Sequence, residues 1–528
     1  MSGPRAARSS GWLACLAAVA FPGVASAQLT FSNLLEGQAG YNPFNADQVK
    51  SKNATDYYDQ FNAEYAFPTL RLGARFEANH SSSETQSFMG YEEFTQRYAD
   101  WSDEHLRARL GNFYTILGRG LIHRSFELPG LVLDQPGRAD HERFGPSRDV
   151  DGVLAEADAG RFSARLFSGR PKLGDQALGT PNGVLTGAQG VVDVLRDSKI
   201  GAAYVRFSNT GFASEYASGF VEADPLRLAG LEAAALPLYF EYAQANRSWG
   251  DWWKFSTGSR DTSALYASAN LISGPFALAA EWKDYRAFRL GFNDPPSLVP
   301  EHSYYLLNRN THFLIADQEK GFQLEGSYSV PAWGSLTLNQ SRGDGDIGSL
   351  FGPKPVRFEE KYAEVRVAPK RYRDWEGTVF YQRGKDEFIS IARRWTAGAS
   401  TTARFLERFS TTLDFEMLGA HRVDFFGRPT DRFIDRYVSL SVARSQRGSI
   451  AAVWQRTNDP LDEALEDQQD LVVQPNTFFS MVLNARLSDQ NEATLFVGER
   501  RPGLACTAGT CYVVEAFKGA ELRLTTRF

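Results

Sequence analysis

The last ten residues of the 528-residue chain read Gly519-Ala520-Glu521-Leu522-Arg523-Leu524-Thr525-Thr526-Arg527-Phe528. Residues of two kinds alternate along this stretch, and each kind shares one face of an extended strand. One face would carry Ala520, Leu522, Leu524, Thr526 and Phe528, and the other Glu521, Arg523, Thr525 and Arg527. This period of two predicts a β-strand with an apolar and a polar side.

This ending is similar to the C-terminal strand of bacterial outer-membrane barrel proteins, in which the terminal aromatic residue belongs to the signal read by the barrel-assembly machinery. The resemblance implies that Phe528 is a C-terminal assembly signal. It also implies that the barrel-assembly machinery is a partner during biogenesis.

Alternating segments recur from residue 29 onward and are separated by turn residues, some in short turns and some in long Gly/Pro/Asp-rich connections. Tight turns at one end and long loops at the other are typical of a membrane β-barrel. A soluble β-sandwich is the alternative, because it also has short strands at regular spacing. Clear strands are 70–78, 276–282, 322–330, 363–367 and 479–487, and we expect long loops at 173–197, 293–319 and 458–476.

The composition favours the barrel. Mean hydropathy is −0.36, and beyond the first 30 residues no run approaches 18 apolar residues, which excludes a helical membrane protein. Only a closed sheet then satisfies the backbone in lipid. We therefore predict an all-β, transmembrane, antiparallel up-and-down barrel over residues 28–528, a single domain with about 22 strands (range roughly 18–24).

The N-terminus has the pattern of a signal peptide. Arg5 and Arg8 precede an apolar run, and Ala25-Ser26-Ala27 has the small-x-small form that signal peptidase reads. We predict a signal peptide over residues 1–27, cleavage between Ala27 and Gln28, and a location in the bacterial outer membrane. An N-terminal core helix and a lipoprotein anchor at Cys15 are the alternatives.

Removal of residues 1–27 would leave two cysteines, Cys506 and Cys511, in a short loop. Such a pair fits a disulfide in an oxidising compartment, and the strand order places it outside the cell. Metal binding is the other reading, but no nearby His or Cys completes four ligands. We expect no metal and no cofactor.

Residues 106–171 resemble an uncharacterised family of bacterial outer-membrane barrel proteins, porin-like in fold, that share a GNFY-x-x-x-G-x-G element. The element reads Gly111-Asn112-Phe113-Tyr114 with Gly118 and Gly120, and Asp151-Gly152 matches the pair that opens the next strand. The resemblance implies a barrel in the cell envelope, without a known substrate or catalytic residue. The glycines themselves indicate close backbone approach or an inward bend. A phosphate loop would need a Gly-Lys-Ser/Thr ending, which is missing.

The polar faces of the clearest strands are rich in Arg and acids. One explanation is a charged pore lining that selects solutes electrostatically. The other is a network of paired charges that braces the wall. Because basic and acidic residues are interleaved along these faces, the bracing network is favoured. The formal charge of −6, or −8 without the signal peptide, excludes a nucleic-acid partner. The predicted lumen residues are Arg71, Arg75, Glu77, Arg107, Arg109, Glu325, Glu364, Arg366, Glu521, Arg523 and Arg527.

A porin-like channel for small solutes is the function these features favour. A structural scaffold or secretion partner is one alternative, and an outer-membrane enzyme is another, with Asp140-His141-Glu142 as its densest polar group. We see no catalytic motif and predict no enzyme. Outer-membrane lipid, including lipopolysaccharide, is the expected surrounding partner, and the oligomeric state is left open.

Overall fold

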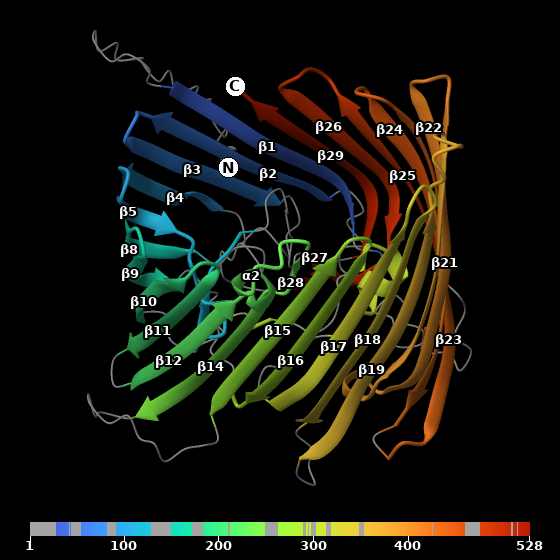
Figure 1. The fold of residues 1–528 in the computed structure, drawn as a ribbon. Helices are drawn as coiled ribbons and strands as arrows, with labels where there is room; N and C mark the ends of the chain where they lie inside the picture. The colour runs from blue at the N-terminus through green and yellow to red at the C-terminus, as the bar shows by residue number, and fades with distance from the viewer. Residues whose placement is uncertain are drawn as a thin grey trace, which may run out of the picture.

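The structure is a computed structural model in which long antiparallel strands run obliquely around a closed wall (Figure 1). It describes residues 28–41, 43, 54–81, 91–127, 149–171, 183–209, 212–248, 262–288, 292–293, 295–296, 302–312, 318–347, 353–424, 426–459, 476–507, 510–514 and 516–528. The predicted signal peptide and Asp140-His141-Glu142 lie outside these residues. The first strand begins at Gln28, and the signal peptide stays a prediction.

Twenty-four long strands form the wall. The first twelve are β1 Gln28–Tyr41, β2 Ala54–Ala66, β3 Leu70–Ser81, β4 Tyr91–Ser102, β5 Leu106–Phe113, β8 Val150–Ala159, β9 Phe162–Pro171, β10 Val184–Leu195, β11 Ser198–Asn209, β12 Phe212–Ala223, β14 Leu238–Ser248 and β15 Ser263–Ser273. The others are β16 Phe276–Arg286, β17 Gln318–Val330, β18 Gly334–Ile347, β19 Lys354–Val367, β20 Trp375–Asp386, β21 Ile391–Phe405, β22 Phe409–Val423, β23 Pro429–Arg444, β24 Gly448–Thr457, β25 Asn476–Arg486, β26 Asn491–Arg500 and β29 Phe517–Arg527.

Short elements lie in the connections. They are β6 Ile116–Leu117, β7 His123–Arg124, α2 Pro225–Leu228, β13 Ala234–Ala235, α3 Tyr305–Arg309, the 3-10 turn η2 Glu387–Ile389, β27 Gly503–Thr507 and β28 Thr510–Val514. Within the described part of the chain, no helix is both long and apolar enough to cross a membrane.

The quoted C-terminal segment closes the barrel. It forms most of β29, which pairs antiparallel with β26 on one side and with β1 on the other, so that Leu524 lies opposite Leu35. Closure removes the free sheet edges that would otherwise leave backbone groups unpaired. An all-β antiparallel closed barrel is therefore confirmed as the fold class.

The prediction of about 22 strands is slightly low. Strand β10 contributes to the difference because it lies inside 173–197, which we expected to be a loop. Gly187 and Gly190 interrupt its alternation of apolar and polar residues. Its strand character comes instead from full pairing with β9 and β11.

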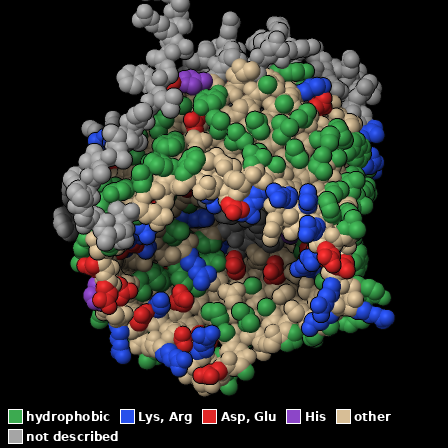
Figure 2. Space-filling model, turned by 90° about the horizontal axis from the view of Figure 1, so that it is seen from above, with side chains coloured by type: hydrophobic (Ala, Val, Ile, Leu, Met, Phe, Trp, Pro, Cys, Tyr) green, Lys and Arg blue, Asp and Glu red, His purple; other side chains and the backbone are tan. Residues whose placement is uncertain are grey.

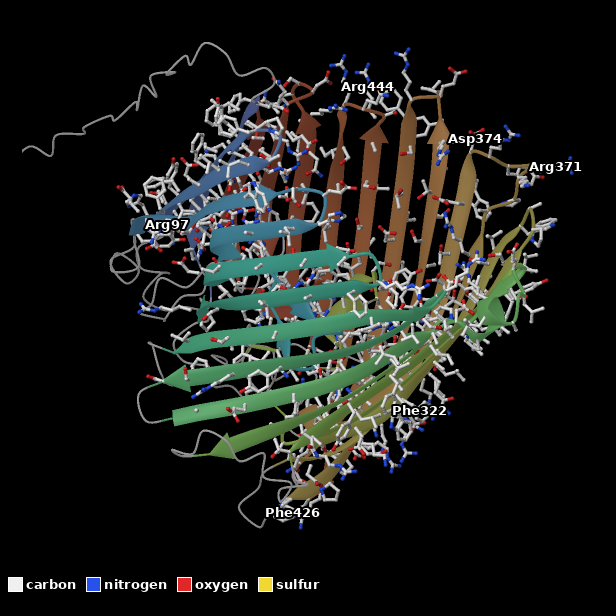
Figure 3. All side chains as sticks on the ribbon, turned by 60° about the vertical axis from the view of Figure 1, so that its left-hand side comes forward. Arg97, Phe322, Arg371, Asp374, Phe426 and Arg444 are labelled. Carbon is white, nitrogen blue, oxygen red and sulfur yellow. The ribbon has the colours of Figure 1, made fainter. Side chains whose placement is uncertain are left out.

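The two ends of the barrel differ. One end carries short turns, such as 67–69, 103–105 and 160–161, and there the backbone of Phe31 donates to the carbonyl of Phe528 at 3.1 Å. Figure 3 shows Arg371, Asp374 and Arg444 at this end and Phe426 at the opposite end, where the longer connections lie. We call them the short-turn end and the long-loop end.

The two faces of the wall also differ. Outward side chains include exposed apolar residues on strands around the wall, such as Leu110, Leu166, Phe240 and Leu338. Inward side chains include buried polar groups, because segments of the chain fold into the lumen and cover them. The core of the molecule therefore lies inside the barrel, at the contact between these inserts and the wall.

Candidate functional site

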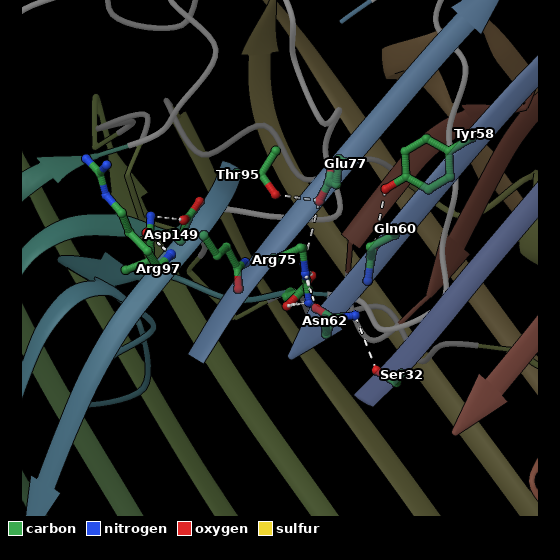
Figure 4. A network of polar contacts seen from close by, with 12 residues as sticks. Ser32, Tyr58, Gln60, Asn62, Arg75, Glu77, Thr95, Arg97 and Asp149 are labelled. Carbon is green, nitrogen blue, oxygen red and sulfur yellow. Dashed lines mark hydrogen bonds and ion pairs between the residues drawn. The ribbon is translucent and has the colours of Figure 1, made fainter. Parts of the chain in front are cut away.

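Five of the seven predicted lumen arginines pair with a carboxylate. Near the long-loop end, Arg75 binds the carboxylate of Glu127, and Glu77 is fully buried and accepts from Thr95 at 2.8 Å. Figure 4 shows this network, in which Arg75 also donates to Asn62 at 2.6 Å. Glu127 belongs to an insert, so these bonds join the insert to the wall.

A second group surrounds Asp100 near the short-turn end. Arg107 binds Asp100 at 2.7 Å and Glu156 at 3.1 Å, and Arg109 reaches Asp100 at 3.5 Å. Arg71 lies opposite Asp100 in the pairing of β3 with β4. Three predicted arginines therefore gather around one carboxylate that sequence reasoning did not select.

A third group lies at the closing seam. Arg523 binds Glu36 of β1 at 2.6 Å, and Glu521 binds Arg500 of β26 at 2.6 Å. These pairs link the last strand to both of its neighbours. Glu36 and Arg500 were not predicted, although alternation places both on inward faces.

The remaining predicted residues are spread around the inner wall. Glu325 accepts from Asn339 at 3.1 Å, Arg366 binds Glu376 at 2.7 Å, and Glu364 accepts from Tyr304 at 2.7 Å. Arg527 lies at the end of β29, opposite Ser32. The predicted residues form several clusters along the wall and no single site.

The first insert is residues 114–127, directly after the GNFY element. The backbone bends inward at Gly118 and Gly120, which have φ of +54° and +92°. A Cβ at Gly118 would lie 2.5 Å from the carboxylate of Glu241 of β14, so a larger residue would require that carboxylate to move. The amide of Arg119 donates to Glu241 at 3.1 Å.

The first insert is held by an apolar core as well. Leu117, Leu121 and Ile122 are fully buried against aromatic side chains of the wall. His123 lies 4.8 Å from Phe167, ring to ring, and its burial lowers the pKa of the imidazole to about 3. This histidine is therefore a neutral packing residue.

The second insert, which we call the strap, comprises the described residues between 287 and 312. Phe288 and Phe292 pack in the same apolar core as the first insert, and Asn293 donates to the carbonyl of Leu121 at 2.7 Å. The later part of the strap contacts β19 to β23. The strap therefore joins two regions of the wall.

Helix α3 anchors the strap on its far side. Glu416 of β22 accepts from the amides of Tyr305 at 2.9 Å and Leu306 at 2.7 Å. These amides have no partner within the helix, so the carboxylate satisfies the helix N-terminus. Tyr305 also stacks on Tyr437 of β23, with ring centroids 4.6 Å apart.

Two buried ion networks flank α3. His302 contacts Glu360 of β19 at 2.9 Å, and the same carboxylate binds Arg394 of β21 at 2.8 Å. On the other side of α3, His312 lies 2.9 Å from Asp386 and 3.5 Å from Glu319. All six of these side chains are nearly inaccessible to solvent.

A third segment enters the lumen after β26. Arg501 is buried and binds Asp435 of β23 at 3.0 Å, and Arg309 of α3 donates to the carbonyl of Pro502. The hairpin of β27 and β28 follows, with Cys506 opposite Cys511 in its register. Their side chains are outside the described residues, so the disulfide stays a prediction.

Sequence reasoning missed the charges that hold the inserts, namely Glu241, Lys283, Glu319, Glu360, Arg394 and Glu416. The sequence contains a partial signal for these charges, because several of them lie two positions from a large aromatic residue and therefore share its strand face. Phe358-x-Glu360-x-Tyr362 is one example, and Lys283-x-Tyr285 is another. In a membrane barrel an apolar strand face is expected to meet lipid, whereas these aromatic residues pack inside the barrel.

The short-turn end opens into a hollow, whose margin carries both Lys or Arg and Asp or Glu side chains (Figure 2). The inserts contact the wall deeper in the barrel, toward the long-loop end. Among the described residues, no group of three His, Cys, Asp or Glu side chains is arranged to hold a metal ion. The lumen is thus a wide polar vestibule that leads to a crowded region.

Comparisons with known proteins give limited matches. Residues 14–135 match a family described as "Family of unknown function (DUF6029)", which overlaps the beginning of the GNFY region. No curated protein matches the chain.

Solved structures with similarity include three bacterial proteins. The siderophore receptor PirA from Pseudomonas aeruginosa is 10% identical over 95% of this chain and 80% of its own, with a TM-score of 0.43. The translocation pore of the P pilus usher PapC is 9% identical over 95% and 99%, with a TM-score of 0.46. The outer membrane protein OpdK from Pseudomonas aeruginosa is 9% identical over 71% and 97%, with a TM-score of 0.39.

Proposed function

We propose that the protein is an outer-membrane channel for small hydrophilic solutes, in which the inserts narrow the lumen. The outer-membrane location is supported by the closed wall, its exposed apolar outer residues and the signal peptide predicted over 1–27. The short-turn end would then face the periplasm. Phe528, which lies at that end, would be the residue read by the barrel-assembly machinery.

The observation that carries this proposal is that the lumen has a wide, hollow part and a part that is occupied by the inserts. Barrels of 16–18 strands already leave an aqueous channel, so a wall of 24 strands encloses more space than its own side chains fill. The inserts occupy part of that space while the short-turn end stays hollow (Figure 2). A wide pore with a narrow section is the form of a size-selective channel.

The charges of the wall support weak selectivity for ion sign. Arg107, Arg109 and Arg523 are each within ion-pair distance of a carboxylate, so the field of one charge cancels much of the other. Their main contribution in this proposal is to brace the wall. Solute size, set by the strap and the first insert, would then determine what passes.

Single-channel recording in planar bilayers tests the proposal. Purified barrel in neutral lipid is expected to give discrete conductance steps, with a reversal potential near zero in asymmetric KCl. A protein that is folded, as judged by a heat-dependent shift in gel mobility, and gives no steps would overturn it.

A further inference from the structure

The outer surface carries a row of basic side chains, one on each of six strands between β17 and β24. Each lies toward the long-loop end from most of the exposed apolar residues of its own strand. We call this set the outer basic row, and it consists of Lys320, Arg342, Lys361, Arg383, Arg436 and Arg456.

Alternation fixes the outward direction of this row. Lys361 lies between Glu360 and Tyr362, which are both buried inside the barrel against the strap. Arg436 lies between Asp435, which binds Arg501, and Tyr437, which stacks on α3. Neighbouring residues of a strand point to opposite faces, so the basic side chains point away from the lumen.

Apolar outward residues continue each strand toward the short-turn end. Tyr381 and Val379 follow Arg383, with 50% and 54% of their surface exposed. Val438 and the 48% exposed Leu440 follow Arg436 in the same way. The row therefore marks one edge of the apolar outer surface, at the level where lipid headgroups would lie in an outer leaflet.

Like charges face one another within the row. Lys361 is paired in register with Arg383, and Arg436 is paired with Arg456. Like charges directly opposite on one face of a sheet repel each other. An arrangement that repeats this repulsion fits a surface that receives an anion.

Acids compensate only part of the row. Arg342 binds Asp344 at 2.8 Å, and Lys361 lies 3.7 Å from Glu359. Among the residues that the structure describes, no carboxylate pairs with Arg383, Arg436 or Arg456. These three arginines are therefore available to a ligand outside the barrel.

We infer that the outer basic row binds the phosphate groups of the glycolipid in the outer leaflet, the lipid part of lipopolysaccharide. The guanidinium group of an arginine can donate two parallel hydrogen bonds to phosphate oxygens. The apolar residues on the short-turn side of the row would contact the acyl chains. The inference rests on the outer-membrane location proposed above, and it does not depend on conduction.

The test measures glycolipid binding to the full-length mature protein in neutral detergent micelles, by native mass spectrometry. The probes are lipid A with both phosphates and the same glycolipid with both phosphates removed. The variant is Arg383→Gln/Arg436→Gln/Arg456→Gln. A matched control is Arg404→Gln/Arg408→Gln/Arg444→Gln, which removes three arginines at the short-turn end, where Figure 3 shows Arg444.

Phosphorylated lipid A is expected to bind the wild type and the control equally, and the row variant at least about tenfold more weakly. The dephosphorylated glycolipid should bind all three proteins weakly. Equal binding of phosphorylated lipid A to the row variant and the wild type, or equal binding of the two glycolipids to the wild type, would overturn the inference.

If the row variant does not fold, the salt dependence of the wild type replaces it. Binding of phosphorylated lipid A should weaken as NaCl rises, because salt screens exposed charges, and an unchanged affinity would reject the inference. Conductance in neutral-lipid bilayers is recorded separately. Its absence would reject the channel and leave glycolipid binding unaffected.

Discussion

Buried charge is the main feature at the scale of residues. Lys283 of β16 has no accessible side-chain surface and binds Glu319 of β17 at 2.6 Å, and Glu319 in turn faces His312 of the strap. A charge buried in this way is stable only with its partner. The inner wall therefore holds the strap through buried ion pairs, each of which is stable only while both of its partners are present.

Lys283→Met should lower the free energy of unfolding by about 3–5 kcal/mol, because the Glu319 carboxylate loses its closest cation. Lys385→Met is a suitable control, since Lys385 binds Glu387 at a partly exposed site and its loss should cost about 0–1 kcal/mol. Urea unfolding followed by Trp fluorescence measures both. Equal effects of the two substitutions would contradict the role given to Lys283.

His312 should make the attachment of the strap depend on pH. Burial alone lowers the pKa of His312, but hydrogen bonds to the carboxylates of Asp386 and Glu319 outweigh it and raise the pKa above its usual value. Lys283 and Arg394 are the nearby cations, on β16 and β21. The raised pKa means that the charged imidazole stabilises the folded protein below about pH 6.5, the unfolded value.

This stabilisation should disappear as the pH rises through the pKa of the folded state. Urea midpoints of the wild type and His312→Gln, measured between about pH 5.5 and 9, should therefore converge at the high end. A difference between the two proteins that stays constant over this range would show that His312 does not carry the proton.

At the scale of elements, the strap and the first insert show where prediction from the sequence stops. Strands β16, β17, β19, β25 and β29 could be predicted because strict alternation reports a wall with two different faces. The strap could not, because its position depends on Glu416, Glu360 and Asp386, which lie far from it in the sequence. Alternation shows that these acids face inward but does not show which segment they meet.

Glu416→Ala tests the anchoring of α3. Without the carboxylate, the amides of Tyr305 and Leu306 lose their acceptor, which should destabilise the attachment of the strap by about 1–2 kcal/mol. Hydrogen exchange should become faster in residues 304–310, while β19 and β22 keep their protection.

Asp414→Ala, at the next inward position of β22, serves as the control because Asp414 accepts from Ser400 of the wall. Exchange in 304–310 that is equally fast in both variants would contradict the capping role of Glu416.

At the scale of the whole molecule, the main features are the closed wall of the barrel and the shape of its lumen. The closed all-β wall could be predicted from the alternation of apolar and polar residues, although two features were not foreseen. The strand number is slightly higher than predicted, and the lumen is partly filled by connections between the wall strands. Loop composition alone does not show whether a connection folds inward, because its partners lie on the wall.

The effect of reversing the charge of a lumen arginine should depend on whether that arginine is paired with a carboxylate. Arg71→Glu, near the short-turn mouth, should move the reversal potential in asymmetric KCl toward cation preference by several millivolts, because Arg71 is exposed to the vestibule. Arg523→Glu should instead lower stability, since it would place a third acid beside Glu36 and Glu521. An unchanged reversal potential in Arg71→Glu would assign this residue to bracing only.

If this barrel conducts and the strap narrows it, removal of the strap should widen the pore. Single-channel conductance of the wild type is compared with that of a variant in which residues 302–312 are replaced by an equal length of Gly and Ser, which removes α3, His302 and His312. Small steps are expected for the wild type, and steps several times larger for the variant. Equal conductance of the two folded proteins, or none from either, would contradict this expectation.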